Sequence, residues 1–180
     1  MLKTTLALVC VLCVGLAAPL GAKDDEFLKF DGGIGVIPVS NVTVNPTTGA
    51  VTVSPNAVRG VPPPGQIWVI EAFKAEIESN GHIEVRGRGL LLGGGNNIGT
   101  NANQSVHATL ICDPATTAQP NPPQFSTPSA GVPLDPDGDF RIDDMLSPPP
   151  PAVCASPVLL IRSVGGSWFA AGILDRDDDN

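Results

Sequence analysis

The feature that most constrains the fold is the stretch of residues 67–92, in which residues 73–78 and 83–88 alternate apolar and polar side chains with the period of a half-buried β-strand. The alternation is interrupted once, by the sequence Ser-Asn-Gly at residues 79–81, and then resumes. Two such strands around a short polar break are typical of a β-hairpin. The apolar positions of the two strands are Phe73, Ala75, Ile77, Ile83 and Val85.

The register of this hairpin follows from its two faces. Opposite residues in an antiparallel pair point to the same side, so Ile77 must lie opposite Ile83 if both are to stay on the apolar face. That pairing requires a three-residue loop ending at Gly81, which adopts a left-handed conformation without a Cβ clash. It also places Phe73 opposite Gly87, and we expect the ring of Phe73 to lie across that glycine.

The other face of the hairpin carries charge. We expect exposed diagonal pairs, Lys74 with Glu84 and Glu76 with Arg86, each stabilising by well under ~1 kcal/mol. Such a charged stripe is typical of a solvated sheet face, and a ligand-binding face is the alternative interpretation. Arg86 is the candidate ligand contact on this face.

Composition and turn signals favour strands throughout. Glycine (20 residues) and proline (19 residues) are abundant, and no stretch has the periodicity of an amphipathic helix. Two β-branched segments, residues 41–45 and 50–54, flank the turn sequence Pro-Thr-Thr-Gly. We therefore predict an all-β fold, an antiparallel β-sandwich of about seven to nine strands with Ig-like or Greek-key topology and negligible helix. A closed barrel is the alternative fold.

Residues 1–22 are typical of a signal peptide. Lys3 supplies the positive charge, residues 6–16 are apolar, and small residues follow at Ala18 and Ala22. The apolar run is shorter than the ~18 residues expected of a membrane span. We expect the protein to be secreted or held in the cell envelope, with no membrane span after signal cleavage; an uncleaved anchor is the alternative.

The rest of the chain divides into three parts. Residues 23–33 are predicted to be a flexible N-terminal segment, residues 34–174 the β-sandwich domain, and residues 175–180 an acidic tail. The whole chain has 10 basic and 18 acidic residues, a formal net charge of −8. Nucleic acids and anionic membrane surfaces are disfavoured as partners, because both need a cationic surface.

The four cysteines fall into two pairs. Cys10 and Cys13 lie inside the apolar part of the predicted signal peptide, which is not the helix N-terminus that a redox Cys-x-x-Cys motif needs. Cys112 and Cys154 remain. In a secreted chain, a pair of this kind is expected to form a disulfide.

One motif resembles a metal loop. Asp135, Asp137 and Asp139 match the first three oxygen-ligand positions of a calcium loop, but the twelfth position, which should be a bidentate carboxylate, is Leu146. We favour a simple hairpin turn at Asp137-Gly138 with solvated carboxylates. Weak calcium binding is the alternative, and we expect no other cofactor.

Three further side chains are candidate ligand contacts. Trp68 and Trp168 could stack on a ligand, although burial in the core is the competing interpretation. His107 lies on the more polar face of a predicted strand at residues 105–112, so we expect it to be exposed or hydrogen-bonded. No catalytic motif is present. The adjacent Asp143 and Asp144 would point to opposite faces of a strand.

Several blocks of the sequence carry a resemblance. GGIGVIPVS, GRGLLLGGGNNIG, GDFRIDD and PVLLIR with GGSWFAAGI resemble a group of small, uncharacterised secreted bacterial β-sandwich proteins. The resemblance implies the fold but no activity and no site residues. A β-sandwich with a disulfide, long polar loops and an acidic surface favours a secreted extracellular or cell-envelope binding or structural module, with an unknown extracellular protein or glycan as ligand, and not an enzyme. The alternatives are a weakly calcium-binding surface protein and a hydrolase with an unrecognised active site.

Overall fold

A computed structural model describes residues 26–113 and 121–176, and every regular element in these ranges is a β-strand. The predicted signal peptide, residues 1–22, lies outside them, as do residues 177–180 of the predicted tail. The all-β prediction is confirmed. The strands are β1 (Glu26–Gly35), β2 (Val39–Val44), β3 (Val51–Pro55), β4 (Trp68–Val69), β5 (Ala72–Glu78), β6 (His82–Arg88), β7 (Leu91–Leu92), β8 (Ser105–Ile111), β9 (Gln124–Ser126), β10 (Val132–Pro133), β11 (Phe140–Met145), β12 (Val158–Ser163) and β13 (Trp168–Leu174).

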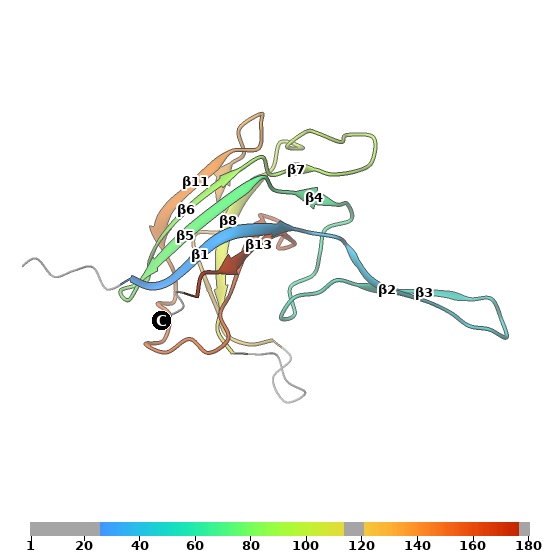
Figure 1. The fold of residues 1–180 in the computed structure, drawn as a ribbon, viewed down its shortest axis with the longest axis horizontal. Helices are drawn as coiled ribbons and strands as arrows, with labels where there is room; N and C mark the ends of the chain where they lie inside the picture. The colour runs from blue at the N-terminus through green and yellow to red at the C-terminus, as the bar shows by residue number, and fades with distance from the viewer. Residues whose placement is uncertain (1–25, 114–120, 177–180) are drawn as a thin grey trace, which may run out of the picture.

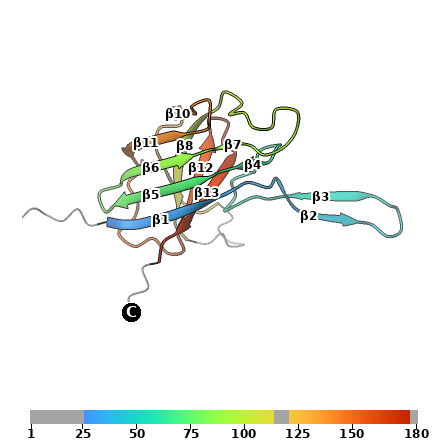
Figure 2. The same cartoon turned by 45° about the horizontal axis from the view of Figure 1, so that its top comes forward.

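Nine of these strands form one antiparallel sheet that curls on itself. Its order is β10-β8-β12-β13-β1-β5-β6-β11, and β9 pairs with β8 beside this path. Figure 2 shows β1, β5, β6 and β11 side by side in one layer, with β8, β12 and β13 crossing behind them. The end strands β10 and β11 contact each other, so the sheet is nearly closed and barrel-like, and the two layers are the two sides of one curved sheet.

The core fills the space between the two layers. Alternate residues of β5 and β6 point inward, as the sequence predicts, while β8 and β12 are buried on both faces along most of their length. The largest fully buried side chains are Phe30, Phe73, Ile77, Ile83, Leu90, Leu110, Ile111, Leu159, Leu160 and Ile161. Among the described residues, no helix is long and apolar enough to cross a membrane.

The β5–β6 hairpin has the predicted register. Ile77 lies opposite Ile83 and Phe73 opposite Gly87, with Gly81 in a left-handed conformation at φ 92°. The prediction that Phe73 covers Gly87 is wrong, however. The ring of Phe140, on the neighbouring strand β11, occupies the space where a Cβ of Gly87 would stand. The hairpin sequence alone does not reveal which strand packs beside β6.

The predicted flexible segment, residues 23–33, is also wrong for the residues that can be described. Residues 26–33 form most of β1, which lies between β13 and β5 in the sheet. The register of β1 shifts between Phe30 and Gly33, and this irregularity hides the alternation that would identify a strand. Phe30 is completely buried, so it anchors β1 to the core.

The predicted disulfide is present. Cys112, directly after β8, is bonded to Cys154, which precedes β12, across a sequence separation of 42 residues. Cys112 is buried in the core. The bond links the end of β8 to the segment that precedes β12, a strand that pairs with β8.

Two strands stand apart from this sheet. β2 and β3 form a separate hairpin that projects away from the rest of the molecule, and both views show it extending clear of every other strand (Figures 1 and 2). We call residues 39–55 the arm and the rest of the described structure the body.

Candidate functional site

The two tryptophans belong to the core. The ring of Trp68 stacks on Phe169, with ring centroids 4.0 Å apart and an interplanar angle of 11°. Trp168 is buried and its indole Nε1 donates a hydrogen bond to the backbone oxygen of Asn56 at 2.9 Å. Neither ring is open to a stacking ligand, in agreement with the core interpretation.

His107 differs from its prediction. It is buried on β8, opposite Arg162 of β12, and its Nδ1 has no hydrogen-bond partner among the described residues. Burial lowers the pKa of His107, and the nearby positive charge of Arg162 lowers it further. The expectation of an exposed histidine is wrong because β8 is covered on both faces, which its sequence alternation does not reveal.

The three aspartates of the calcium-like motif form a turn. The backbone N–H of Asp135 donates to the oxygen of Asp139 at 2.9 Å, and the N–H of Gly138 donates to the oxygen of Asp135 at 2.8 Å. Carboxylate oxygens of Asp137 and Asp139 accept from the backbone N–H groups of Asp139 and Gly89. In the described ranges, no three His, Cys, Asp or Glu side chains are grouped so that they could hold a metal ion.

Arg86 belongs to a banded charged surface on the outer face of β5, β6 and β11. Like charges lie directly opposite one another across these strands, an arrangement that destabilises a sheet unless the charges are otherwise paired. The cationic band is Lys74, Arg86 and Arg141, and the anionic band beside it is Glu76, Glu84 and Asp143.

Contacts between the bands neutralise this repulsion. Glu84 accepts a hydrogen bond from Arg86 at 2.7 Å and forms an ion pair with Arg141 at 2.8 Å. Lys74 pairs with Asp31 at 3.3 Å rather than with Glu84 as predicted. Arg86 lowers the pKa of Glu84 through a hydrogen bond, and Glu84 correspondingly raises the pKa of Arg86. Arg86 is therefore engaged by its neighbour in the same strand.

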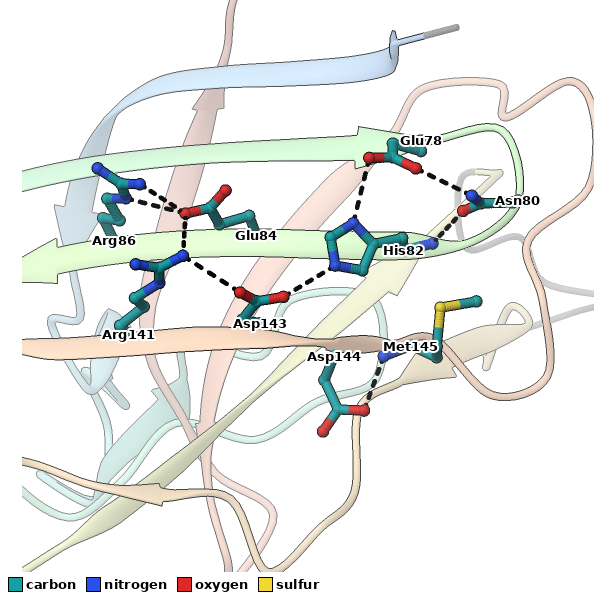
Figure 3. A network of polar contacts seen from close by, with 9 residues as sticks. All are labelled: Glu78, Asn80, His82, Glu84, Arg86, Arg141, Asp143, Asp144 and Met145. Atoms are coloured by element: carbon teal, nitrogen blue, oxygen red, sulfur yellow. Dashed lines mark hydrogen bonds and ion pairs between the residues drawn. The ribbon is translucent and has the colours of Figure 1, made fainter. Parts of the chain in front are cut away.

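The network continues to His82, beside the hairpin turn (Figure 3). Its Nε2 lies 2.9 Å from Asp143 and its Nδ1 lies 3.2 Å from Glu78. The hydrogen bond with Asp143 is the main cause that raises the pKa of His82, and the same bond lowers the pKa of Asp143. Because both ring nitrogens face carboxylates, the imidazolium form is favoured and no ring nitrogen is left to act as a general base.

The arm is uncharged, in contrast to the outer face of β5, β6 and β11. No residue between Asp31 and Arg59 carries a charge. Four valines share one face of the arm and are 54% to 61% exposed, while the other face carries hydroxyl and amide side chains. The cross-strand pairs of this valine face are Val42 with Val53 and Val44 with Val51.

A bulge keeps the valine face continuous with the body. The register of β2 and β3 shifts between Val39 and Asn41, so that Val39 lies opposite Pro55. Pro55 alternates with Val53 and is therefore on the valine face, which places Val39 there as well. If the two strands paired regularly, Ser40 would lie opposite Pro55 and Val39 would point to the polar face of the arm.

The valine face ends at an apolar hollow in the body. This hollow has a volume of about 490 Å³ and is lined by Ile37, Pro38, Val39 and Ile67 together with Gly65, Gln66, Gly94 and Gly95. Ile37 is 60% exposed and Ile67 is 39% exposed. The valine face and the hollow together form one exposed apolar surface, which we call the apolar stripe.

Asn56 ties the base of the arm to the body. Its backbone N–H donates to Pro38 at 2.8 Å and its side-chain amide donates to Ile37 at 2.9 Å, while its carbonyl oxygen accepts from Trp168. At the tip, the side chain of Asn45 accepts from the N–H groups of Thr47 and Thr48 and closes the turn. The arm is thus anchored at one end and capped at the other.

Comparisons with protein-family models, curated proteins and solved structures find no significant match to this chain. The resemblance to small secreted proteins therefore stays a prediction.

None of the candidate ligand contacts lies on the arm. The sequence does contain a signal for the apolar stripe, because residues 39–55 alternate as a strand pair should but place Thr, Ser and Asn, rather than Lys or Glu, between the valines. A strand pair exposed to water on both faces usually carries charge.

Proposed function

We propose that this protein is a secreted binding or structural module of the extracellular space or the cell envelope, and that it binds through the apolar stripe. The observation that carries the proposal is the set of four half-exposed valines on an arm that no described residue covers. Contiguous exposed apolar surface of this kind is typical of interaction sites.

The arm also lacks the partners that a stable sheet needs. A two-stranded hairpin is only marginally stable in water, and stability comes from a third strand or from packing on its apolar face. The arm has neither within the described residues, since β2 and β3 pair only with each other. A partner outside the chain would supply the missing contacts.

The chemistry of the stripe favours a protein as partner. Nucleic acids and anionic surfaces are recognised by cations, which the arm does not have. A sugar ring is commonly held against an aromatic face, whereas both tryptophans of this chain are buried. Aliphatic side chains in a flat, uncharged row instead match the apolar surface of another protein.

The test is removal of the arm from the full chain. The backbone N–H of Asn56 donates to the oxygen of Pro38 at 2.8 Å, as across a two-residue hairpin turn, so residues 39–55 can be replaced by Asn-Gly. We expect the body of this variant to keep its thermal unfolding temperature and its Cys112–Cys154 disulfide, and to be released into the medium as a free monomer. The unaltered chain should be found in larger assemblies or held at the envelope. An unchanged distribution of the armless variant would refute the proposal.

A further inference from the structure

We infer that the partner of the apolar stripe is a second copy of this chain. This inference rests on the proposed function. Two arms lie antiparallel with valine face against valine face, and the tip of each arm reaches the apolar hollow of the other copy.

The apolar stripe is complementary to itself under a two-fold rotation. The rotation places the pair Val42 and Val53 of one arm over the same pair of its partner, near the axis. The tip pair, Val44 and Val51, then lies towards the partner's Val39 and hollow. Each copy therefore offers both the projecting apolar element and the hollow that receives it.

Charge explains why the contact is carried by an arm. The chain has a formal net charge of −8, so two bodies brought into direct contact would repel each other. A strand of six residues, the length of β2, extends about 20 Å, which exceeds the Debye length of about 8 Å at physiological salt. Antiparallel arms hold the bodies at opposite ends of an uncharged contact, where their repulsion is screened.

The backbone of the arm suits packing on its face better than pairing at its edge. Burial of the valines is the main source of association free energy, and a partner strand added beside β2 would leave all four exposed. Face-to-face packing of two short sheets covers them, as in a small sandwich. Two hairpins that are each marginal alone then stabilise one another.

The first experiment compares two variants with the same charge on opposite faces of the arm. Val42→Asp with Val53→Asp places two carboxylates on the valine face, and Thr43→Asp with Thr52→Asp places two at neighbouring cross-strand positions on the polar face. Sedimentation velocity of the unaltered mature protein should show a concentration-dependent dimer. The valine variant should stay monomeric throughout, and the threonine variant should dimerise with less than a ~10-fold change in dissociation constant.

Two results of this experiment would overturn the inference. One is an unaltered protein that stays monomeric up to ~1 mM. The other is equal loss of the dimer in both variants, which would assign the effect to charge rather than to the valine face. Thermal unfolding of both variants should match the unaltered body, which shows that the substitutions have not unfolded it.

A second experiment separates this inference from the proposed function. A photoreactive benzophenone side chain replaces Val44, and in a matched control it replaces Thr43 on the opposite face. In the cells that secrete the protein, we expect the Val44 position to give an adduct of twice the chain mass, joined near residues 37–39 or 66–67 of the second copy. An adduct with a different protein would refute self-association and leave the arm as an interaction surface. Absence of any adduct would refute both.

Discussion

The two hairpins of this protein, β5–β6 and β2–β3, have the same alternating pattern and opposite surroundings. In β5–β6 the apolar face is buried, both outer edges pair with β1 and β11, and the outer face is charged. In β2–β3 the apolar face is exposed, both outer edges are unpaired in the described structure, and neither face is charged. Alternation therefore identifies a strand, but it does not show whether the apolar face of that strand is covered.

The contrast also separates stability from binding. The β5–β6 hairpin contributes buried side chains to the core and carries a polar network whose charges pair with one another. The arm contributes almost nothing to the core. Substitutions in the first hairpin should therefore change the free energy of unfolding, and those in the second should change association with a partner.

The largest difference between the two hairpins is expected when a charge is placed on the apolar face of each. Ile77→Lys buries an ammonium group at a position with 0% exposure and should cost more than ~4 kcal/mol of the free energy of unfolding. Val42→Lys, at the corresponding face of the arm, should change it by less than ~0.5 kcal/mol. Urea unfolding of dilute protein, followed by circular dichroism, measures both. Similar losses in the two variants would show that the arm belongs to the core.

A smaller difference between the two hairpins is expected when one glycine of each is replaced by alanine. A Cβ at Gly87 would overlap the ring of Phe140, so Gly87→Ala should cost ~1–3 kcal/mol. Gly49, at the arm tip, has φ +67°, and a Cβ added there would meet nothing within 4 Å, so Gly49→Ala strains only the local turn. Differential scanning calorimetry should show a lower melting temperature for Gly87→Ala alone. Equal melting temperatures would mean that Phe140 moves aside without cost.

How much of this contrast is predictable from the sequence depends on which contacts are local. The register of β5–β6 can be predicted, because Ile77, Ile83 and Gly81 lie within one hairpin and its loop length fixes the pairing. The side chain that packs on Gly87 cannot be predicted, because it is Phe140, on a strand distant in sequence. The prediction for His107 fails for the same reason, because residues distant in sequence pack over its face of β8.

The candidate site is harder to predict than the fold. The sequence predicts strands at residues 41–45 and 50–54 around a turn, and the structure confirms this in β2 and β3. That these strands leave the body cannot be derived, because alternation does not distinguish a covered valine from an uncovered one. Residue type alone suggests Trp68 and Trp168 as ligand contacts, and both are buried.

The smallest effect concerns the charged face of β5–β6. The pKa of His82 is raised above its ordinary 6.5, so the stabilisation from this histidine is present below that value and lost as pH rises through the raised pKa. The pKa of Asp143 is lowered below its ordinary 3.8, so its stabilisation is present above that value and lost as pH falls through the lowered pKa.

His82→Gln should therefore lower the urea midpoint slightly at about pH 5 and leave it unchanged at about pH 9. The effect is small because the His82 side chain is 33% exposed and Asp143 is more exposed still. The arm, which has no titratable group, provides the internal control: Thr43→Gln should have the same effect at both pH values. A His82→Gln effect that does not depend on pH would rule out the histidine charge as its cause.

The most direct test of the central claim is hydrogen–deuterium exchange of the protein at increasing concentration. The claim is that the arm is left uncovered by its own chain and is completed by a second copy. In dilute protein, amides of β2 and β3 should exchange far faster than those of β5 and β6, because a lone hairpin opens readily. As the concentration rises from low micromolar towards millimolar, the arm should gain protection while β5 and β6 stay unchanged. An arm that is fully protected in dilute protein, or one whose exchange does not respond to concentration, would contradict the account.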